Sequence, residues 1–326
     1  MRLQEYADRW ITERPNLRPR TVELYRWLLG RCITPHLGER RLAELDNNAP
    51  AIRTWRQTLI GSGVSATVVA KAYRLLRAVL NTAANEDEIM RRNPCRIKGA
   101  DREDPAERPT LTPAEVASLA ARVPSRYVAM VMLTTYASLR WGEVTALRRV
   151  DIDLDSCTVT VTRAHVQLSQ GGIVTGPLKS RAGRRVVAFP PALVPLLRRH
   201  LSEYVGEEPD ALVFTGAKGA ALQRGNFRRA VKWTKIATEL GLAGLHFHDL
   251  RHTGNTLASK VPGTTIRDLM LRMGHDSTRA AMVYLHTAQG ADRAIGDALP
   301  VEFEDATDPD DDDDEGAAGA LVPVGH

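Results

Sequence analysis

The sequence predicts a mostly helical α+β protein with one small antiparallel β-sheet, and three observations support this class. Apolar residues recur with helical spacing through the first hundred residues, through 112–136 and again beyond residue 190. Only the stretch 152–189 has the alternating pattern and the flanking turn residues that are typical of strands. A charged segment that contains Pro105, residues 99–108, separates the two parts and is expected to be a linker.

The first part is expected to form a helical domain over residues 1–98. Three apolar stripes with helical spacing come first, beginning at Leu3, Val22 and Ile52. The fourth stripe is the clearest, and Ser65 is placed to cap its helix. Basic residues stand between the stripes, so the surface of this domain is expected to contact DNA through residues such as Lys71 and Arg74.

The second part is expected to form a domain over residues 109–300. Residues 112–115 read Thr-Pro-Ala-Glu, which is the pattern of a capping box with proline at the first helical position. Strand signals follow at 152–161 and at 185–189, on either side of a glycine-containing loop. Further helices are then expected to the end of the domain.

Charge is distributed unevenly along the 326 residues, which hold 44 Lys and Arg against 39 Asp and Glu. Residues 301–326 contain ten acidic side chains and no basic one, so the first 300 residues have a balance of +15. A body this basic favours a polyanionic partner, most simply nucleic acid, over a merely basic enzyme. The acidic tail is expected to be disordered and to increase solubility. The sharper hypothesis is that the tail mimics DNA and occupies the basic groove when DNA is absent.

Other features of the sequence indicate the cellular compartment in which the protein works. No apolar run approaches the ~20 residues of a membrane span, and the first residues are charged where a signal peptide is apolar. The three cysteines form no Cys-x-x-Cys pair, which indicates a reducing compartment. We therefore expect a cytoplasmic protein, associated with the nucleoid when it binds DNA, that has no contact with a membrane.

Several polar residues of the second part stand in apolar surroundings. Arg140 lies between two apolar helical stretches, where a guanidinium needs an anion, and Glu143 can hold it from the same helix face. His248 and Arg251 are also three residues apart, so one helix face presents both. A glycine that is suited to end a helix precedes His275.

The segment 176–185 lies between strand-like runs and is expected to be a hairpin tip. Its basic residues could face a phosphate backbone: Lys179, Arg181, Arg184 and Arg185. Three histidines have a spacing that could chelate zinc: His246, His248 and His252. No acidic or cysteine pattern completes that site, so no metal is expected. A tyrosine in a helix, such as Tyr284, is by itself usually a core residue.

Taken together, two arginines, a lysine, two histidines and a tyrosine suit phosphoryl transfer through a covalent tyrosine intermediate. Two guanidiniums can hold the nonbridging oxygens of the phosphate. Histidines can move a proton, a lysine can protonate the leaving 5′ oxygen, and a tyrosine ionises more readily beside positive charge.

In order and spacing these residues resemble the tyrosine recombinase, or phage integrase, family over about residues 109–290. The preceding helices are similar to that family's core-binding domain. The matching motifs are SLRWGEVTAL with Arg140, PLKSRAGRR with Lys179, HDLRHT with His248 and Arg251, MGHDS with His275, and Tyr284 nine residues after that histidine.

The resemblance implies a helical core-type DNA-binding domain followed by a tyrosine-recombinase catalytic domain. It implies that Tyr284 attacks the scissile phosphate to form a 3′-phosphotyrosine, with Glu143 as a supporting residue and without a cofactor or metal. The other residues are implied to bind the phosphate or to move protons around it: Arg140 and Arg251 for the phosphate, Lys179 as general acid, His248 and His275 for proton transfer.

The resemblance also implies partners: double-stranded DNA with core-type recombination sites, and a homotetramer on that DNA, with a monomer in solution. An excisionase or a host DNA-bending protein is a candidate accessory factor. Because the core-binding helices begin almost at Met1, the expectation is an integrase of a phage or integrative element without an arm-binding domain. A truncated chain, a Xer-like or transposon recombinase, a type IB topoisomerase-like enzyme and a DNA-binding regulator are the alternatives.

Overall fold

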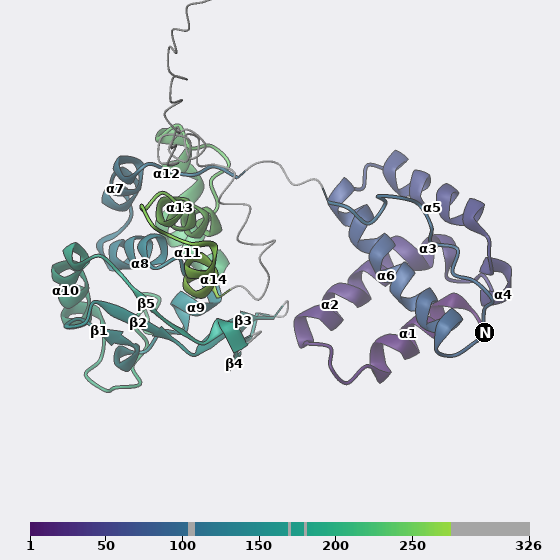
Figure 1. Ribbon diagram of the computed structural model, residues 1–326, viewed down its shortest axis with the longest axis horizontal. Helices are drawn as coiled ribbons and strands as arrows, with labels where there is room; N and C mark the ends of the chain where they lie inside the picture. Colours follow the sequence, from purple (N-terminus) through teal and green to yellow (C-terminus); the bar gives the residue numbers. More distant parts are fainter. Residues whose placement is uncertain (104–107, 169–170, 179–180, 275–326) are drawn as a thin grey trace, which may run out of the picture. The chain divides into compact units, whose positions relative to one another are not determined.

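The computed structural model describes residues 1–103, 108–168, 171–178 and 181–274 (Figure 1). The mostly helical fold with small antiparallel sheets confirms the predicted class. Two large hydrophobic cores share no residue, one drawn from residues 3–100 and the other from residues 111–250. Among the described residues, no helix combines the length and the apolar character that crossing a membrane requires.

The first core is built by helices alone. The elements are α1 (Leu3–Glu13), α2 (Pro19–Leu28), a π-helical stretch Leu29–Ile33, α3 (Thr34–Leu37), α4 (Leu42–Leu45), α5 (Ala49–Gly61) and α6 (Ala66–Asn85). The four predicted stripes are α1, α2, α5 and α6, and the structure adds the two four-residue helices. Ser65 does occupy the N-cap of α6, but its side chain makes no capping hydrogen bond.

Helix α6 has 20 residues and is the longest element of this core, and its buried face runs from Val69 to Ala83. Val69, Leu76 and Val79 are each 1% exposed, and burial of such a side chain contributes about 1.5–3 kcal/mol. The polar atoms of two buried indoles are satisfied: Trp10 Nε1 donates to Thr82 Oγ1 at 2.9 Å and Trp55 Nε1 donates to the Cys32 carbonyl at 2.7 Å.

The second core is enclosed by the remaining elements. The helices of this part are α7 (Pro113–Arg122), α8 (Ser125–Tyr136), α9 (Trp141–Thr145), α10 (Val194–Tyr204), α11 (Arg224–Val231), α12 (Trp233–Glu239), α13 (Phe247–Ser259) and α14 (Ile266–Met273), of which α14 buries Leu269 and Met273 in a small cluster of its own. The capping box predicted at the start of α7 is confirmed, since Thr112 Oγ1 accepts from the Glu115 amide at 3.2 Å and Glu115 Oε2 accepts from the Thr112 amide at 2.7 Å.

The strands form two sheets rather than the one that was predicted. One has the order β1 (Ile152–Asp153), β2 (Thr158–Val161), β5 (Arg185–Ala188), and the other pairs β3 (Arg163–Gln167) with β4 (Ile173–Pro177). The prediction of a hairpin tip at 176–185 is therefore wrong, because β4 and β5 belong to different sheets. β5 pairs with β2, which places Val187 opposite Val159 and buries both side chains in the core. The side chains of β3 are all half-buried, so its pairing with β4 does not depend on burial of one face in the core.

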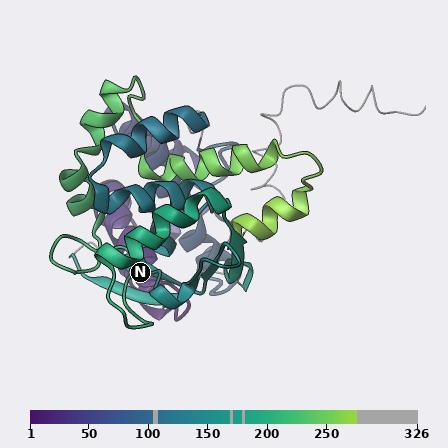
Figure 2. The same cartoon turned by 90° about the vertical axis from the view of Figure 1, so that its left-hand side faces the viewer.

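Helices α8 and α13 lie side by side in both views (Figures 1 and 2). Gly254 permits this packing, since a Cβ atom at that position would lie 1.9 Å from the Thr135 carbonyl oxygen. Any side chain there would push the two helices apart. The close approach brings Arg251, one turn earlier in α13, to the segment that leaves α8 and leads to Arg140.

Candidate active site

Arg140 and Glu143 form the pair that the sequence predicts. Arg140 is the N-cap of α9, and its backbone amide and Nη1 donate to the two oxygens of Glu143 at 2.9 and 2.8 Å. The Glu143 side chain is 2% exposed, whereas that of Arg140 is 38% exposed. The carboxylate therefore fixes the guanidinium from the protein side and leaves part of it open to an anion from outside.

Glu143 serves three guanidiniums rather than one. Arg185 Nη1 and Nη2 donate to its two oxygens at 3.2 and 2.9 Å, and Arg251 Nη1 lies 3.9 Å from Oε2. Burial alone would raise the pKa of Glu143, but the hydrogen bonds and charge of Arg185, then those of Arg140, lower it to about 2. The ionised carboxylate offsets one of three positive charges, so the cluster retains an excess that attracts an anion.

Arg251 is almost completely buried, with 2% exposure. Nη1 donates to the Ser138 carbonyl, and Nη2 donates to the Met273 carbonyl at 2.6 Å. Ser138 has a left-handed backbone with φ of 52°, which is uncommon for a residue other than glycine. The turn that follows α8 is thus shaped to present a carbonyl to Arg251.

The C-terminal end of α14 meets the same cluster. The last carbonyls of a helix have no intrahelical partner and form its negative pole. Here each of three consecutive carbonyls accepts from a different guanidinium: Arg272 from Arg185 Nε at 2.8 Å, Met273 from Arg251 at 2.6 Å, and Gly274 from Arg140 Nη2 at 3.3 Å. Gly274 ends the helix with φ of 60°, which confirms the predicted glycine stop before His275.

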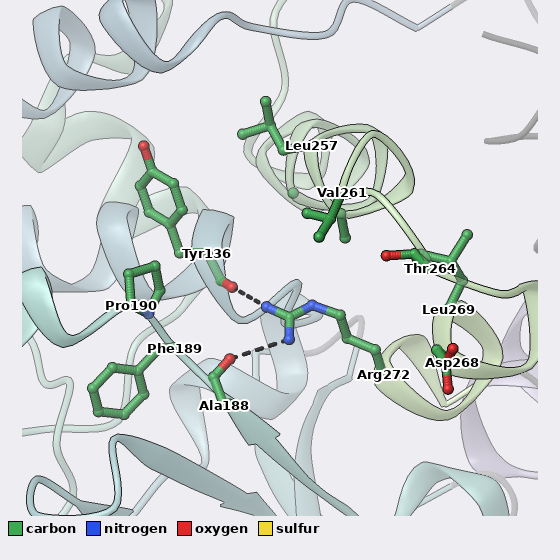
Figure 3. Close-up of a pocket in the computed structure, with 12 residues that line it drawn as sticks. Tyr136, Ala188, Phe189, Pro190, Leu257, Val261, Thr264, Asp268, Leu269 and Arg272 are labelled. Atoms are coloured by element: carbon green, nitrogen blue, oxygen red, sulfur yellow. Dashed lines mark hydrogen bonds between the residues drawn. The ribbon is translucent and has the colours of Figure 1, made fainter. Parts of the chain in front are cut away.

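Arg272 attaches α14 to the body of the domain (Figure 3). Its Nη1 donates to the Ala188 carbonyl at 3.1 Å and its Nη2 to the Tyr136 carbonyl, so it joins the ends of β5 and α8. Figure 3 shows this guanidinium at the wall of a pocket that Leu257, Val261 and Leu269 also line. Burial, and then the charge of Arg185, lowers the pKa of Arg272. Nothing in the sequence pattern indicates this anchoring role.

His248 lies at the start of α13, is partly open to solvent, and makes an edge-to-face contact with His252 at 5.0 Å between ring centroids. Loss of solvation lowers its pKa to about 4, and the positive charges of His252, Arg251, Arg224 and Arg140 act in the same direction. The ring is therefore neutral near pH 7, as an acceptor of a proton must be.

We expect the His248 ring of the DNA-free protein to titrate near pH 4, well below the ordinary value of ~6.5. Between those values the unfolded chain binds a proton here that the folded chain does not, so acidification should destabilise the fold. DNA with an intact scissile phosphate should raise the midpoint, because an anion favours imidazolium. NMR of the histidine Cε1 proton measures the titration midpoint with and without DNA, and DNA with a neutral methylphosphonate at the scissile position is the control. A midpoint near 6.5 without DNA would contradict the expectation.

Three of the predicted catalytic residues lie outside the described residues: Lys179, His275 and Tyr284. The described segments next to two of them do meet. A Cβ added to Gly274 would lie 2.9 Å from the Ala182 carbonyl oxygen and 3.3 Å from Gly183 Cα. The chain that follows Lys179 thus touches the chain that precedes His275, at the edge of the arginine cluster.

The structure separates the residues that were predicted to contact DNA. Arg184 is exposed, whereas the Arg185 side chain is 5% exposed and bonded to protein acceptors; the side chain of Arg181 is outside the described set. Lys71 Nζ lies 3.6 Å from Glu103, and Arg74 pairs with the same carboxylate. Such partly exposed pairs are worth only ~0–1 kcal/mol, so a phosphate can replace Glu103 at little cost.

Comparisons with known proteins identify the family of the chain. Residues 109–290 match the model of the Phage integrase family. The integrase of Mycobacterium phage L5 is 35% identical over 305 residues, which cover 91% of this chain and 78% of that protein. The integrase of Mycobacterium phage FRAT1 is 35% identical over 301 residues, covering 90% of this chain and 86% of that protein.

Solved structures share the fold. The Tn1549 transposon integrase in complex with a circular intermediate DNA has a TM-score of 0.79 at 20% identity, covering 92% of this chain and 100% of that one. A lambda integrase dimer bound to a core site has a TM-score of 0.63 at 16% identity, covering 86% and 97%. With the family match over more than half of the chain, these findings lead to one conclusion: the chain belongs to the phage integrase family and is a site-specific tyrosine recombinase.

Proposed function

We propose that this recombinase integrates the DNA of a phage or integrative element by cutting and rejoining core-type sites through a 3′-phosphotyrosine on Tyr284. The observation that carries the proposal is the partly exposed, net-positive cluster around Glu143. Three guanidiniums share one ionised carboxylate there, and Arg140 is 38% exposed toward an incoming anion. A scissile phosphodiester is the anion that this reaction supplies.

The proposed step conserves charge and atoms. The Tyr284 oxygen attacks phosphorus and gives up its proton, with neutral His248 as a candidate acceptor; the bond from phosphorus to the 5′ oxygen breaks. That oxygen takes a proton from Lys179, while Arg140 and Arg251 stabilise the nonbridging oxygens. The reverse step, with a 5′ hydroxyl from the second duplex, rejoins the strands, so neither ATP nor a metal enters the scheme.

Double-stranded DNA is the proposed partner of both parts of the chain. The helical part over residues 1–98 would hold the duplex through basic residues such as Lys71 and Arg74, and the exposed Arg184 of the catalytic part would add a phosphate contact. We further propose a homotetramer on two duplexes, with an excisionase or a host DNA-bending protein as accessory factor. The solved relatives that are bound to DNA support the partner class.

Covalent trapping tests the proposal. The full chain is mixed with duplexes that carry a candidate attachment core and a nick near the cleavage position, so that the released fragment diffuses away and religation fails. Denaturing gels should then show a protein–DNA adduct, and peptide mapping should place it on Tyr284. Marked duplexes should also exchange strands. Cleavage and religation without exchange would indicate a topoisomerase-like enzyme, and specific binding without any adduct would indicate a regulator.

A further inference from the structure

Arg185 makes more hydrogen bonds within the described part of the site than a surface arginine would. Its Nε donates to the Arg272 carbonyl at 2.8 Å, Nη1 to the Gly183 carbonyl at 3.0 Å, and Nη1 and Nη2 to Glu143 at 3.2 and 2.9 Å. These acceptors belong to three segments: the end of α14, the turn before β5, and α9. The side chain is only 5% exposed, which leaves almost no surface for a DNA phosphate.

Glu143 links Arg185 to Arg140. Arg185 binds both oxygens of the carboxylate, and Arg140 binds the same two oxygens with its amide and Nη1. The orientation of the Glu143 carboxylate therefore fixes the direction in which the Arg140 guanidinium points. Arg185 sets that orientation from the buried side, and at the same time it holds the α14 end, whose Gly274 carbonyl also binds Arg140.

We infer that Arg185 is a positioning residue for the recombination reaction, which acts on the scissile phosphate through Glu143 and Arg140 rather than by touching DNA. The inference rests on the proposed role of Arg140 as a phosphate-binding residue. A planar guanidinium with five donors can join a carboxylate and two carbonyls at once, whereas a lysine ammonium is a point charge that cannot span them. Lysine should therefore keep the charge and lose the alignment.

The experiment is a double-mutant cycle on strand cleavage with the full chain and a nicked core-site duplex. Arg185→Lys alone should slow single-turnover cleavage ~10- to 100-fold, because small displacements of a positioned group carry costs of that size. The DNA dissociation constant and its salt dependence should stay unchanged. In an Arg140→Ala background the same substitution should cause little further slowing, because the residue through which it acts is gone.

A matched control is Arg149→Lys. Arg149 Nη1 donates to the Leu201 and Gly206 carbonyls at 3.1 and 3.3 Å, near the end of α10, so it also binds carbonyls at a helix end but has no bond to Glu143. This variant should leave the cleavage rate as it is. Arg185→Gln, which keeps a donor to Glu143 without the charge, provides a second test of the same cycle. The melting temperature of each variant is measured first, and cleavage rates are compared only for variants that remain folded at the assay temperature.

Three results would overturn the inference. Equal slowing by Arg185→Lys with and without Arg140 would show that the two arginines act independently. Weaker DNA binding with a salt slope reduced by ~1 would make Arg185 a phosphate contact. Melting of both Arg185 variants below the assay temperature would assign the residue to stability alone. A normal cleavage rate for Arg140→Ala by itself would instead refute the proposed role of Arg140, so the two failures are distinguishable.

Discussion

Replacement of Tyr284 by phenylalanine should abolish the covalent protein–DNA adduct and reduce strand cleavage by ~10⁴-fold or more, as removal of an enzyme's nucleophile does. The substitution deletes one oxygen atom and leaves the ring in place. DNA binding should therefore stay within a small factor, because a set of phosphate contacts elsewhere provides most of the affinity. Adduct formation on denaturing gels and mobility shifts on native gels measure the two properties separately.

Tyr204→Phe is the matched control for this experiment. The Tyr204 hydroxyl is hydrogen-bonded to Ser125 Oγ at 3.0 Å in an exposed position, and its loss should change neither adduct yield nor binding. Persistence of the adduct in Tyr284→Phe would mean that another side chain is the nucleophile. A loss of binding in step with cleavage would mean that the substitution had disturbed the fold or the DNA surface.

Arg140→Ala should reduce the cleavage rate by ~10²-fold or more while most of the site-specific binding remains. The structure makes this the cleaner of the two arginine tests. Removal of Arg140 leaves Glu143 paired with Arg185, whereas removal of the buried Arg251 would leave the Ser138 and Met273 carbonyls without their guanidinium. The Arg140 variant should therefore fold normally and report on chemistry.

A neutral methylphosphonate at the scissile position sharpens the Arg140 experiment. If the Arg140 guanidinium offsets the negative charge of the phosphate, Arg140→Ala should slow cleavage less on the methylphosphonate, which lacks that charge. Arg148→Ala is the control, since that side chain is 39% exposed and is 3.8 Å from Asp210, an exposure close to that of Arg140. Equal losses of binding and cleavage in Arg140→Ala would make Arg140 a residue of DNA affinity rather than of the reaction.

Parts of the site were predictable because they are local in sequence. Arg140 and Glu143 are three residues apart at a helix start, and Gly274 stands where a helix must stop before His275. Even the burial of Arg185 had a local signal, because it has the same parity in β5 as the buried Val187, whereas Arg184 and Val186 have the opposite parity and are exposed. The run of basic residues obscured that signal.

The number and pairing of the strands were the main errors in the prediction. Alternation identified β1, β2 and β5, but β3 and β4 lie in the stretch that was expected to be a loop. Alternation also did not say that β5 would pair with β2 while β4 paired with β3. Strand pairing depends on which faces must be buried together, and the buried Val159, Val161 and Val187 form one such face. A contiguous basic segment therefore connects two sheets and meets the end of α14.

By itself the sequence determined the longer helices, the capping box at Thr112 and the order of the motifs that identify the family. Periodic burial and hydrogen bonds over three or four residues depend only on residues that are close together in the sequence. Only the tertiary structure decided which arginine serves which acceptor. The three guanidiniums at the end of α14 come from positions 134, 87 and 22 residues away from the carbonyls they bind. A buried guanidinium must find an acceptor, and the packing of distant segments determines which carbonyl or carboxylate lies within its reach.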